Sequence, residues 1–232
     1  MSARSAPLRA AVIVFPGSNG DRDLAEALGA ASFAVQLCRS DEPLPKDVAL
    51  VGLPGGFSYG DYWRAGMLAS RARAVRGLPP HIAGGGLVIG VCNGFQILVE
   101  AGLLPGALGY NAPPGFRHRW VELEVSASAA GSPWFGLLPA GARLNLPMAH
   151  GEGRYQPPAD ATEHGDRVPL RYCNNPNGSH LDAAALLDRS GRVLGIMPHP
   201  ERAADPRLGS SDGMALFASA ARHLRAALGD SP

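Results

Sequence analysis

Lysine and cysteine are scarce in this sequence. Its 232 residues include one lysine, Lys46, so its other basic residues are arginines. The three cysteines, Cys38, Cys92 and Cys173, are far apart and form no CxxC pair. An odd number of widely spaced cysteines argues against a disulfide framework and against a cysteine zinc site. We therefore expect a protein of the reducing cytoplasm.

Long apolar runs, an excess of one charge and nucleotide-binding motifs are also missing. No stretch approaches the ~20 apolar residues of a membrane span, and the apolar run near the N-terminus has only strand length, so we expect neither a membrane segment nor a signal peptide. The net charge of +1 gives no reason to expect nucleic acid or an anionic membrane as a partner. The sequence has no G-x-x-x-x-G-K-[ST] loop and no G-x-G-x-x-G between a strand and a helix. The missing motifs predict no nucleotide chemistry in this chain. Because no second cysteine lies near Cys92 in the sequence, we also expect no metal, and we expect no cofactor in this chain.

In the first half of the chain, short apolar segments alternate with amphipathic ones. The pattern predicts buried strands and intervening helices; the strands are expected at 8–15, 33–38, 47–56 and 84–91, and the helices at 20–31, 62–78 and 93–104. Strands that alternate with helices form a parallel sheet with helices on both faces.

Beyond about residue 115 the pattern changes. Residues 119–125 alternate like a half-exposed strand, and residues 185–197 are typical of a hairpin around a Ser-Gly turn. The segment 211–228 predicts a helix with one apolar face, made of Met214, Phe217, Ala218, Ala221, Leu224 and Leu228. Without a linker or a repeat, we predict one domain over residues 1–232. Its fold class is α/β, a mostly parallel sheet with flanking helices and a small antiparallel β elaboration.

Cys92 lies in "GVCNGFQ", where a predicted strand turns into a predicted helix. Gly90 and Gly94 complete the G-x-C-x-G spacing of a nucleophile elbow, in which each glycine removes a side chain that would crowd the turn. The helix N-terminus behind the cysteine favours a thiolate over a thiol. Taken alone, the motif leaves open a buried structural cysteine, a metal ligand and a redox thiol.

His199 lies between two prolines in "MPHPE". The prolines stiffen the backbone, and residues two apart in an extended segment point to the same side. Glu201 is therefore expected to accept a hydrogen bond from the imidazole, as the acid of a nucleophile–base–acid triad does. A histidine with only a local capping role is the alternative. Together, Cys92, His199 and Glu201 predict acyl transfer through a thioester.

The segment "PGGFS" follows another strand, and its small residues leave backbone N–H groups free to face an anion. We expect an oxyanion hole made by the N–H of Asn93, the residue after the cysteine, together with Gly56 or Phe57. Gly55 is expected at the substrate pocket. An ordinary Gly-Gly turn is the alternative.

Several of these motifs resemble those of a known family. "GVCNGFQ" with "MPHPE" downstream resembles the class I glutamine amidotransferases, which have a flavodoxin-like fold. The segments "VIVFPGSNGDRD", "LPGGFSYGDYWRAG", "AHGEGRY" and "NPNGS" are similar to those of the glutaminase subunits of phosphoribosylformylglycinamidine synthase. The similarity runs from about residue 11 to residue 203. Two departures stand out: Gly20 replaces a cysteine that is usual in the family, and the segment 163–174 is shorter than usual.

The resemblance implies a reaction. Cys92 would attack the side-chain amide of glutamine, His199 would transfer protons and Glu201 would orient it, and water would then release glutamate. Gln96, one helical turn after Cys92, corresponds to a glutamine-binding position. His150 in "AHGEGRY" lacks the proline frame and is expected to shape the substrate pocket.

The resemblance also implies partners. Ammonia would pass to a large synthetase subunit, which uses ATP and Mg²⁺ to convert formylglycinamide ribonucleotide to its amidine in de novo purine biosynthesis. A small third subunit would bridge the two. Two other functions remain open at this point. One is a stand-alone cysteine hydrolase that acts on γ-glutamyl amides or peptides, and the other is a binding module on a retained fold.

Overall fold

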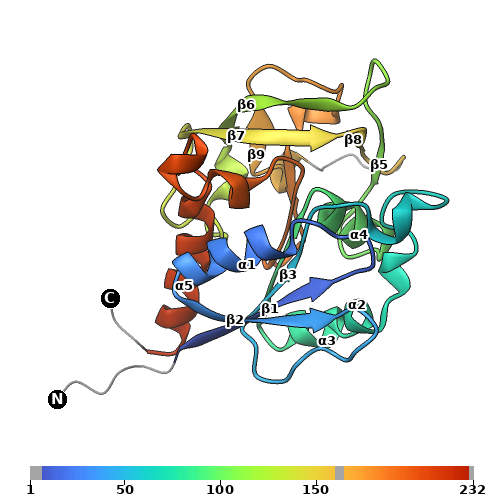
Figure 1. Ribbon diagram of the computed structural model, residues 1–232. Coiled ribbons are helices and arrows are strands. Elements are labelled where there is room, and N and C mark those ends of the chain that lie inside the picture. Colours follow the sequence, from blue (N-terminus) through green and yellow to red (C-terminus); the bar gives the residue numbers. More distant parts are fainter. Residues whose placement is uncertain (1–6, 160–164, 230–232) are drawn as a thin grey trace.

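A six-stranded sheet forms the centre of the computed structural model, which describes residues 7–159 and 165–229 (Figure 1). The strand order is β10-β11-β4-β3-β1-β2, and every neighbouring pair is parallel except β10 with β11. The strands are β1 (Leu8–Val14), β2 (Phe33–Arg39), β3 (Leu50–Leu53), β4 (Leu87–Val91), β10 (Ala185–Leu187) and β11 (Val193–Ile196). The expected mostly parallel sheet is confirmed, and so is the hairpin within 185–197.

Helices pack on both faces of this sheet (Figure 1). On one face lie α1 (Asp21–Ala30) and α5 (Met214–Ala227); on the other lies α4 (Asn93–Glu100), with α2 (Arg73–Arg76) and α3 (Leu78–Ala83) on the same side. Single 3-10 turns occur at Ser58–Asp61, Ala69–Arg71, Ala127–Ala129, Gly165–Arg167, His180–Asp182, Pro200–Ala203 and Pro206–Leu208. Among the residues that the structure describes, no helix is both long and apolar enough to cross a membrane.

Antiparallel strands form a second layer beside the main sheet (Figure 1). β6 (Arg117–Val125) pairs with β7 (Arg143–His150) and with β9 (Leu170–Tyr172), and β5 (Ala107–Tyr110) pairs with β8 (Glu152–Gln156). This layer is the antiparallel elaboration that the sequence predicted. The alternation within 119–125 is confirmed, because Val121, Leu123 and Val125 are buried and the residues between them are exposed.

The prediction of a helix over 62–78 is wrong in its first part. Residues 62–68 form turns, and helical structure begins only at Ala69. Asp61, Trp63 and Gly66 have positive φ angles, so the chain turns repeatedly where a helix would need φ near −60°. The strand predicted over 47–56 is limited to Leu50–Leu53. Of segment 163–174, residues 163–164 lie outside the described residues.

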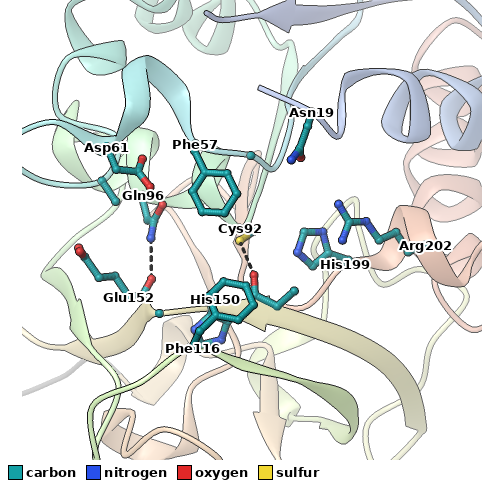
Figure 2. Close-up of a pocket in the computed structure, with 14 residues that line it drawn as sticks. Asn19, Phe57, Asp61, Cys92, Gln96, Phe116, His150, Glu152, His199 and Arg202 are labelled. Carbon is teal, nitrogen blue, oxygen red and sulfur yellow. Dashed lines mark hydrogen bonds between the residues drawn. The ribbon is translucent and has the colours of Figure 1, made fainter. Parts of the chain in front are cut away.

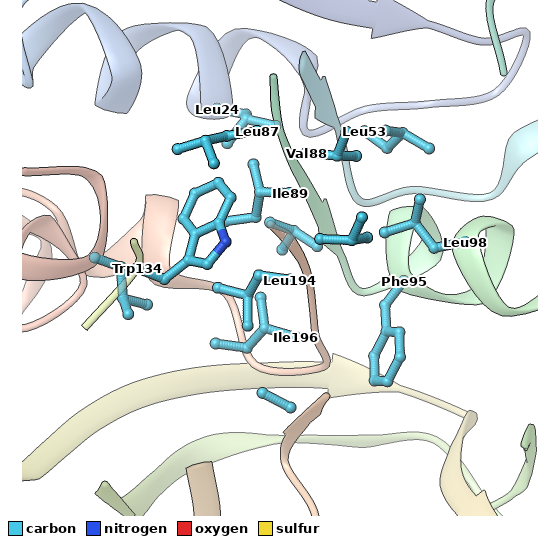
Figure 3. Packing of buried hydrophobic residues seen from close by; sticks show 14 of the residues in the cluster. Leu24, Leu53, Leu87, Val88, Ile89, Phe95, Leu98, Trp134, Leu194 and Ile196 are labelled. Atoms are coloured by element: carbon cyan, nitrogen blue, oxygen red, sulfur yellow. The ribbon is translucent and has the colours of Figure 1, made fainter. Parts of the chain in front are cut away.

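The terminal helix α5 buries much of the apolar face that the helical spacing of its residues predicted. Phe217, Ala221 and Leu224 are buried, whereas Leu228 lies beyond the helix end and is exposed. In the centre of the core, Ile89 and Leu194 lie on neighbouring strands beside Trp134 (Figure 3).

β4 and α4 approach each other so closely that glycine is required between them. A Cβ on Gly90 would lie 2.6 Å from the backbone carbonyl carbon of Gly94, and a Cβ on Gly94 would overlap the carbonyl oxygen of Leu53. On β11, a Cβ on Gly195 would overlap the ring of Phe95. Helix α4 therefore rests directly on the backbone of the sheet. This contact determines the path of residue 92, which joins β4 to α4.

We predict that Gly90→Ala lowers the free energy of unfolding by about 1–3 kcal/mol, because an added methyl group meets backbone atoms that cannot move independently. Urea denaturation measures the change. Gly29→Ala is the matched control, since a Cβ at this site within α1 would meet nothing within 4 Å, and it is expected to stabilise the protein by up to ~1 kcal/mol. Equal stability of the Gly90→Ala variant and the parent would contradict the close contact.

Candidate active site

Cys92 occupies a strained turn between β4 and α4. Its φ is 50° and its ψ is −104°, which is outside the conformations that non-glycine residues usually adopt. Its backbone N–H donates to the carbonyl oxygen of Ile196 at 2.8 Å, and its Sγ lies 3.6 Å from the carbonyl oxygen of Ala149. The sharp strand-to-helix turn that the glycine spacing predicted is present, and Cys92 lines a cavity at this edge of the sheet (Figure 2).

His199 and Glu201 form a buried pair beside the thiol. Nδ1 of His199 lies 2.6 Å from Oε1 of Glu201, and both side chains are at most 3% exposed. Figure 2 shows the imidazole next to Cys92. The expected extended segment is wrong in detail, because Pro200 begins a 3-10 turn that contains Glu201. The turn still brings the carboxylate onto Nδ1, so the contact forms by a different backbone route.

The environment of His199 favours its charged form. Burial by itself lowers the pKa of His199, but the negative charges of Glu201 and of a Cys92 thiolate outweigh burial and raise the pKa to about 10. Nδ1 is taken by Glu201, and Nε2 has no hydrogen-bond partner among the described residues. An imidazolium beside the sulfur stabilises a thiolate, and its free Nε2–H is placed to give a proton to a bound molecule.

His150, at the end of β7, lies in the same cavity and differs from His199 in charge. Its side chain is buried, and burial, followed by the charges of His199 and Arg117, lowers its pKa to about 4. It is therefore neutral at neutral pH. Neither of its ring nitrogens has a hydrogen-bond partner within the described part of the chain.

Gly55 packs directly against the Cys92–His199 pair. A Cβ on Gly55 would lie 2.9 Å from Cε1 of His199 and 3.6 Å from Cβ of Cys92, so a side chain at this position would displace the imidazole. The carbonyl oxygen of Gly55 accepts a hydrogen bond from the N–H of Gly20 at 3.1 Å. Gly20, the position where the family usually has a cysteine, thus helps to hold the segment that faces the imidazole.

The residues expected to form the oxyanion hole differ in whether their backbone N–H groups are free. Asn93 is the first residue of α4, so its backbone N–H has no acceptor within the helix. Gly56, with φ +142°, lines the cavity beside Phe57. The N–H of Phe57, however, donates to the carbonyl oxygen of Gly17 at 3.0 Å and is engaged away from the thiol. An oxyanion role for Phe57 therefore requires this peptide to turn.

A hydrogen-bonded chain of side chains forms the wall on the other side of Cys92. Nε2 of Gln96 donates to the carbonyl oxygen of Glu152 at 2.5 Å, and Oε1 of Gln96 accepts from Nδ2 of Asn93 at 2.9 Å. The same Nδ2 donates to Oδ1 of Asp61 at 3.2 Å, and Oδ1 of Asn93 accepts from the N–H of Ser58 at 3.1 Å. The side chain of Asn93 thus joins α4 to the loop after β3, a role that the sequence did not indicate.

The cavity encloses about 240 Å³, which is below the ~300–1,000 Å³ of sites for drug-sized ligands. Lining residues that the sequence predicted are Gly56, Phe57, Cys92, Gln96, His150 and His199; those it missed include Asn19, Asp61, Ala65, Phe116, Ala149, Gly151, Glu152 and Arg202. Asp61 and Glu152 belong to the segments "GGFSYGDYWRAG" and "HGEGRY", so a carboxylate in each subfamily-specific segment was the available signal. The described residues contain no group of His, Cys, Asp or Glu side chains suited to hold a metal.

Comparison with known proteins is consistent across sequence and structure. Residues 7–222 match the model of the CobB/CobQ-like glutamine amidotransferase domain. The chain is 46% identical over 214 residues to the phosphoribosylformylglycinamidine synthase subunit PurQ of Ruegeria pomeroyi, covering 90% of this chain and 96% of that protein. It is 48% identical over 224 residues to the PurQ subunit of a Synechococcus species, covering 94% and 99%.

Solved structures give the same result. A chain in the structure of PurLQS from Thermotoga maritima is 41% identical and superposes with a TM-score of 0.88, covering 94% of this chain and 100% of that one. Another glutamine amidotransferase from Thermotoga maritima is 16% identical with a TM-score of 0.57 over 97% of this chain and 95% of its own, which bears on the fold alone. The family resemblance of the sequence motifs is confirmed. The chain belongs to the CobB/CobQ-like glutamine amidotransferases and, within them, to the PurQ subunits of phosphoribosylformylglycinamidine synthase.

Proposed function

We propose that this chain is the glutaminase subunit of a phosphoribosylformylglycinamidine synthase. It hydrolyses glutamine to glutamate and ammonia and delivers the ammonia to a synthetase subunit, in de novo purine biosynthesis. The similarity to PurQ subunits and to a chain of PurLQS supports the identity of the complex. The chemistry is carried by one observation: a cysteine on a strained elbow lies beside a buried histidine whose far nitrogen is held by a carboxylate at 2.6 Å.

The first half of the reaction releases ammonia. The Cys92 thiolate attacks Cδ of glutamine, and the carbonyl π electrons move onto the oxygen, where the N–H of Asn93 and the Gly56 backbone stabilise the charge. Nε2 of His199 gives its proton to the amide nitrogen, the C–N bond breaks and ammonia leaves. A γ-glutamyl thioester and a neutral His199 remain.

The second half restores the enzyme. The neutral His199, held through Nδ1 by Glu201, takes a proton from water through Nε2, and the hydroxide adds to the thioester carbon. The C–S bond breaks, so Cys92 returns to the thiolate and His199 to the imidazolium. The new γ-carboxyl group then loses its proton to solvent. The reaction needs no metal or cofactor in this chain; ATP and Mg²⁺ act in the large synthetase subunit.

The partners follow from the same assignment. A large synthetase subunit uses ammonia for the ATP-dependent amidation of formylglycinamide ribonucleotide, and a small bridging subunit completes a complex that acts in the cytoplasm without nucleic acid or membrane. The stand-alone γ-glutamyl hydrolase is not favoured, because the relatives are subunits of a synthase. The geometry of the Cys92–His199–Glu201 set argues against a pure binding module.

We predict that Cys92→Ala abolishes ammonia release, lowering the glutamine-dependent rate by at least about 10³-fold, as expected when a nucleophile is removed. The assay mixes the chain with the synthetase and bridging subunits and measures amidine formation from glutamine. Ammonium salts supplied in place of glutamine are expected to restore amidine formation. Cys173→Ala, which alters a cysteine outside the cavity, is the matched control. Glutaminase activity that survives Cys92→Ala would refute the proposal.

Glu201→Gln is expected to change the pH dependence of the reaction. Glu201 contributes to the raised pKa of His199, whereas burial lowers that pKa, so loss of the carboxylate charge lowers the pKa. The imidazolium is then lost at lower pH, and the alkaline limb of kcat, measured at saturating glutamine, moves to lower pH by roughly one unit or more. The profile of ammonia release from pH 6 to 10.5 measures the shift. An unchanged alkaline limb would show that Glu201 does not set the charge of His199.

A further inference from the structure

Asp23, in the segment "SNGDRD", takes no part in the reaction above, yet it lies close to the buried His199–Glu201 pair. It belongs to the first turn of α1, and α1 packs against the 3-10 turn that contains Glu201. Oδ2 of Asp23 lies 3.5 Å from Nε of Arg202, the residue after Glu201. Asp23 is therefore connected to the buried pair through one guanidinium group.

Arg202 lies between two carboxylates at almost equal distances. Its Nε is 3.6 Å from Oε1 of Glu201 and 3.5 Å from Oδ2 of Asp23, and Figure 2 shows it next to the imidazole of His199. Both distances exceed the ~2.7–2.9 Å of a direct charge-assisted hydrogen bond, so the guanidinium is shared and closes onto neither carboxylate. Asp23 forms no other ion pair with the residues that the structure describes. Loss of one carboxylate would leave Arg202 to the other.

Arg202 and His199 approach the same oxygen atom. Oε1 of Glu201 lies 2.6 Å from Nδ1 of His199, and Oε1 is also the atom that Arg202 approaches. The Glu201 side chain is 1% exposed, so water screens this competition little. Oε2 of Glu201 has no hydrogen-bond partner within the described part of the chain, so the carboxylate has room for a bidentate contact with a guanidinium. A closer Arg202 would take part of the negative charge that holds the imidazolium.

Few other charges face His199. β7 contributes His150, which is neutral at neutral pH, and the turn between β4 and α4 contributes the Cys92 thiolate. In the next 3-10 turn, Asp205 and Arg207 are paired with each other at 2.5 Å, and the first turn of α5 has no acidic residue. The charge balance at the imidazole therefore depends on the shared guanidinium.

We propose that Asp23 is a positioning residue that holds the Arg202 guanidinium away from Glu201. Oε1 of Glu201 then stays on Nδ1 of His199. The proposal rests on His199 as the acid and base of the proposed glutaminase reaction. Without Asp23, Arg202 closes onto Glu201, and the imidazolium loses part of its stabilising charge. The pKa of His199 then falls, and a histidine that is already neutral has no proton to give to the leaving nitrogen.

Asp23→Asn is expected to lower the pKa of His199 by roughly half a unit or more. NMR of the full chain with isotope-labelled histidine measures the titration of the ring nitrogens, and His199→Gln assigns the signal. Asp21→Asn is the matched control, since it removes the same charge from the same turn of α1. Asp23→Glu restores the carboxylate and is expected to keep the parent pKa. Equal shifts in Asp23→Asn and Asp21→Asn, or no shift in either, would overturn the proposal.

A double-mutant cycle tests whether Arg202 carries the effect. Arg202→Gln removes the competing cation and is expected to raise the pKa of His199, a shift opposite in sign to that of Asp23→Asn. In the Arg202→Gln background, Asp23→Asn is expected to change the pKa no more than Asp21→Asn does. A full Asp23→Asn shift in that background would overturn the proposal.

Catalysis gives a second readout and separates this proposal from the proposed function. In the assembled complex, the alkaline limb of kcat, measured at saturating glutamine, is expected to move to lower pH in Asp23→Asn and to stay in place in Asp21→Asn, with KM unchanged in both. A higher KM with an unmoved limb would overturn the positioning role. A wild-type complex that releases no ammonia from glutamine, in a chain whose His199 titration shifts as expected, would overturn the glutaminase function alone and support the role of Asp23.

Discussion

The close contact of helix α4 with the sheet is the constraint on which the site depends. Gly90, Gly94 and Gly195 leave no side chain between helix and strands, so the chain must turn from β4 into α4 within one residue. Cys92 takes that turn at φ 50°. A non-glycine residue holds such a conformation only where its surroundings impose it, and here the glycines on either side leave room for no other path between β4 and α4. The strain presents the sulfur to the cavity instead of burying it in the sheet.

The buried His199–Glu201 pair is the second condition. Removing two ionisable groups from water is costly, and the cost is offset only if each charge has a close partner. Glu201 lies 2.6 Å from Nδ1, and Arg202 lies 3.6 Å from the same carboxylate oxygen and 3.5 Å from Asp23 on α1. The pair is thus tied to the helix on one face of the main sheet, while Cys92 begins the helix on the other. The position of His199 relative to Cys92 is therefore set by how the helices pack on both faces of the main sheet.

The sequence predicted the main sheet well because its strands are short, apolar and separated by amphipathic helices, a pattern with few physical alternatives. It also predicted which residues face one another, since Cys92, His199, His150 and Gln96 all line one cavity. The prediction was wrong over 62–68, because residues with positive φ outweighed the helical composition. One of them, Gly66, packs against α4, where a Cβ would lie 2.7 Å from the backbone nitrogen of Ile97. For Glu201, the expected contact with His199 is present, but the backbone forms a 3-10 turn and not the expected extended segment.

The sequence by itself determined which groups are available for chemistry: a glycine-flanked cysteine, a histidine between prolines and a carboxylate two residues later together predict a thioester mechanism. Only the tertiary structure decided what surrounds that chemistry. Asp61 and Glu152 are 91 positions apart in the numbering of the chain, and no period or motif relates them. They meet because a hydrogen-bonded chain through Asn93 and Gln96 joins the loop after β3 to the start of β8. Contacts of this kind act through space, so they appear only when the chain is folded.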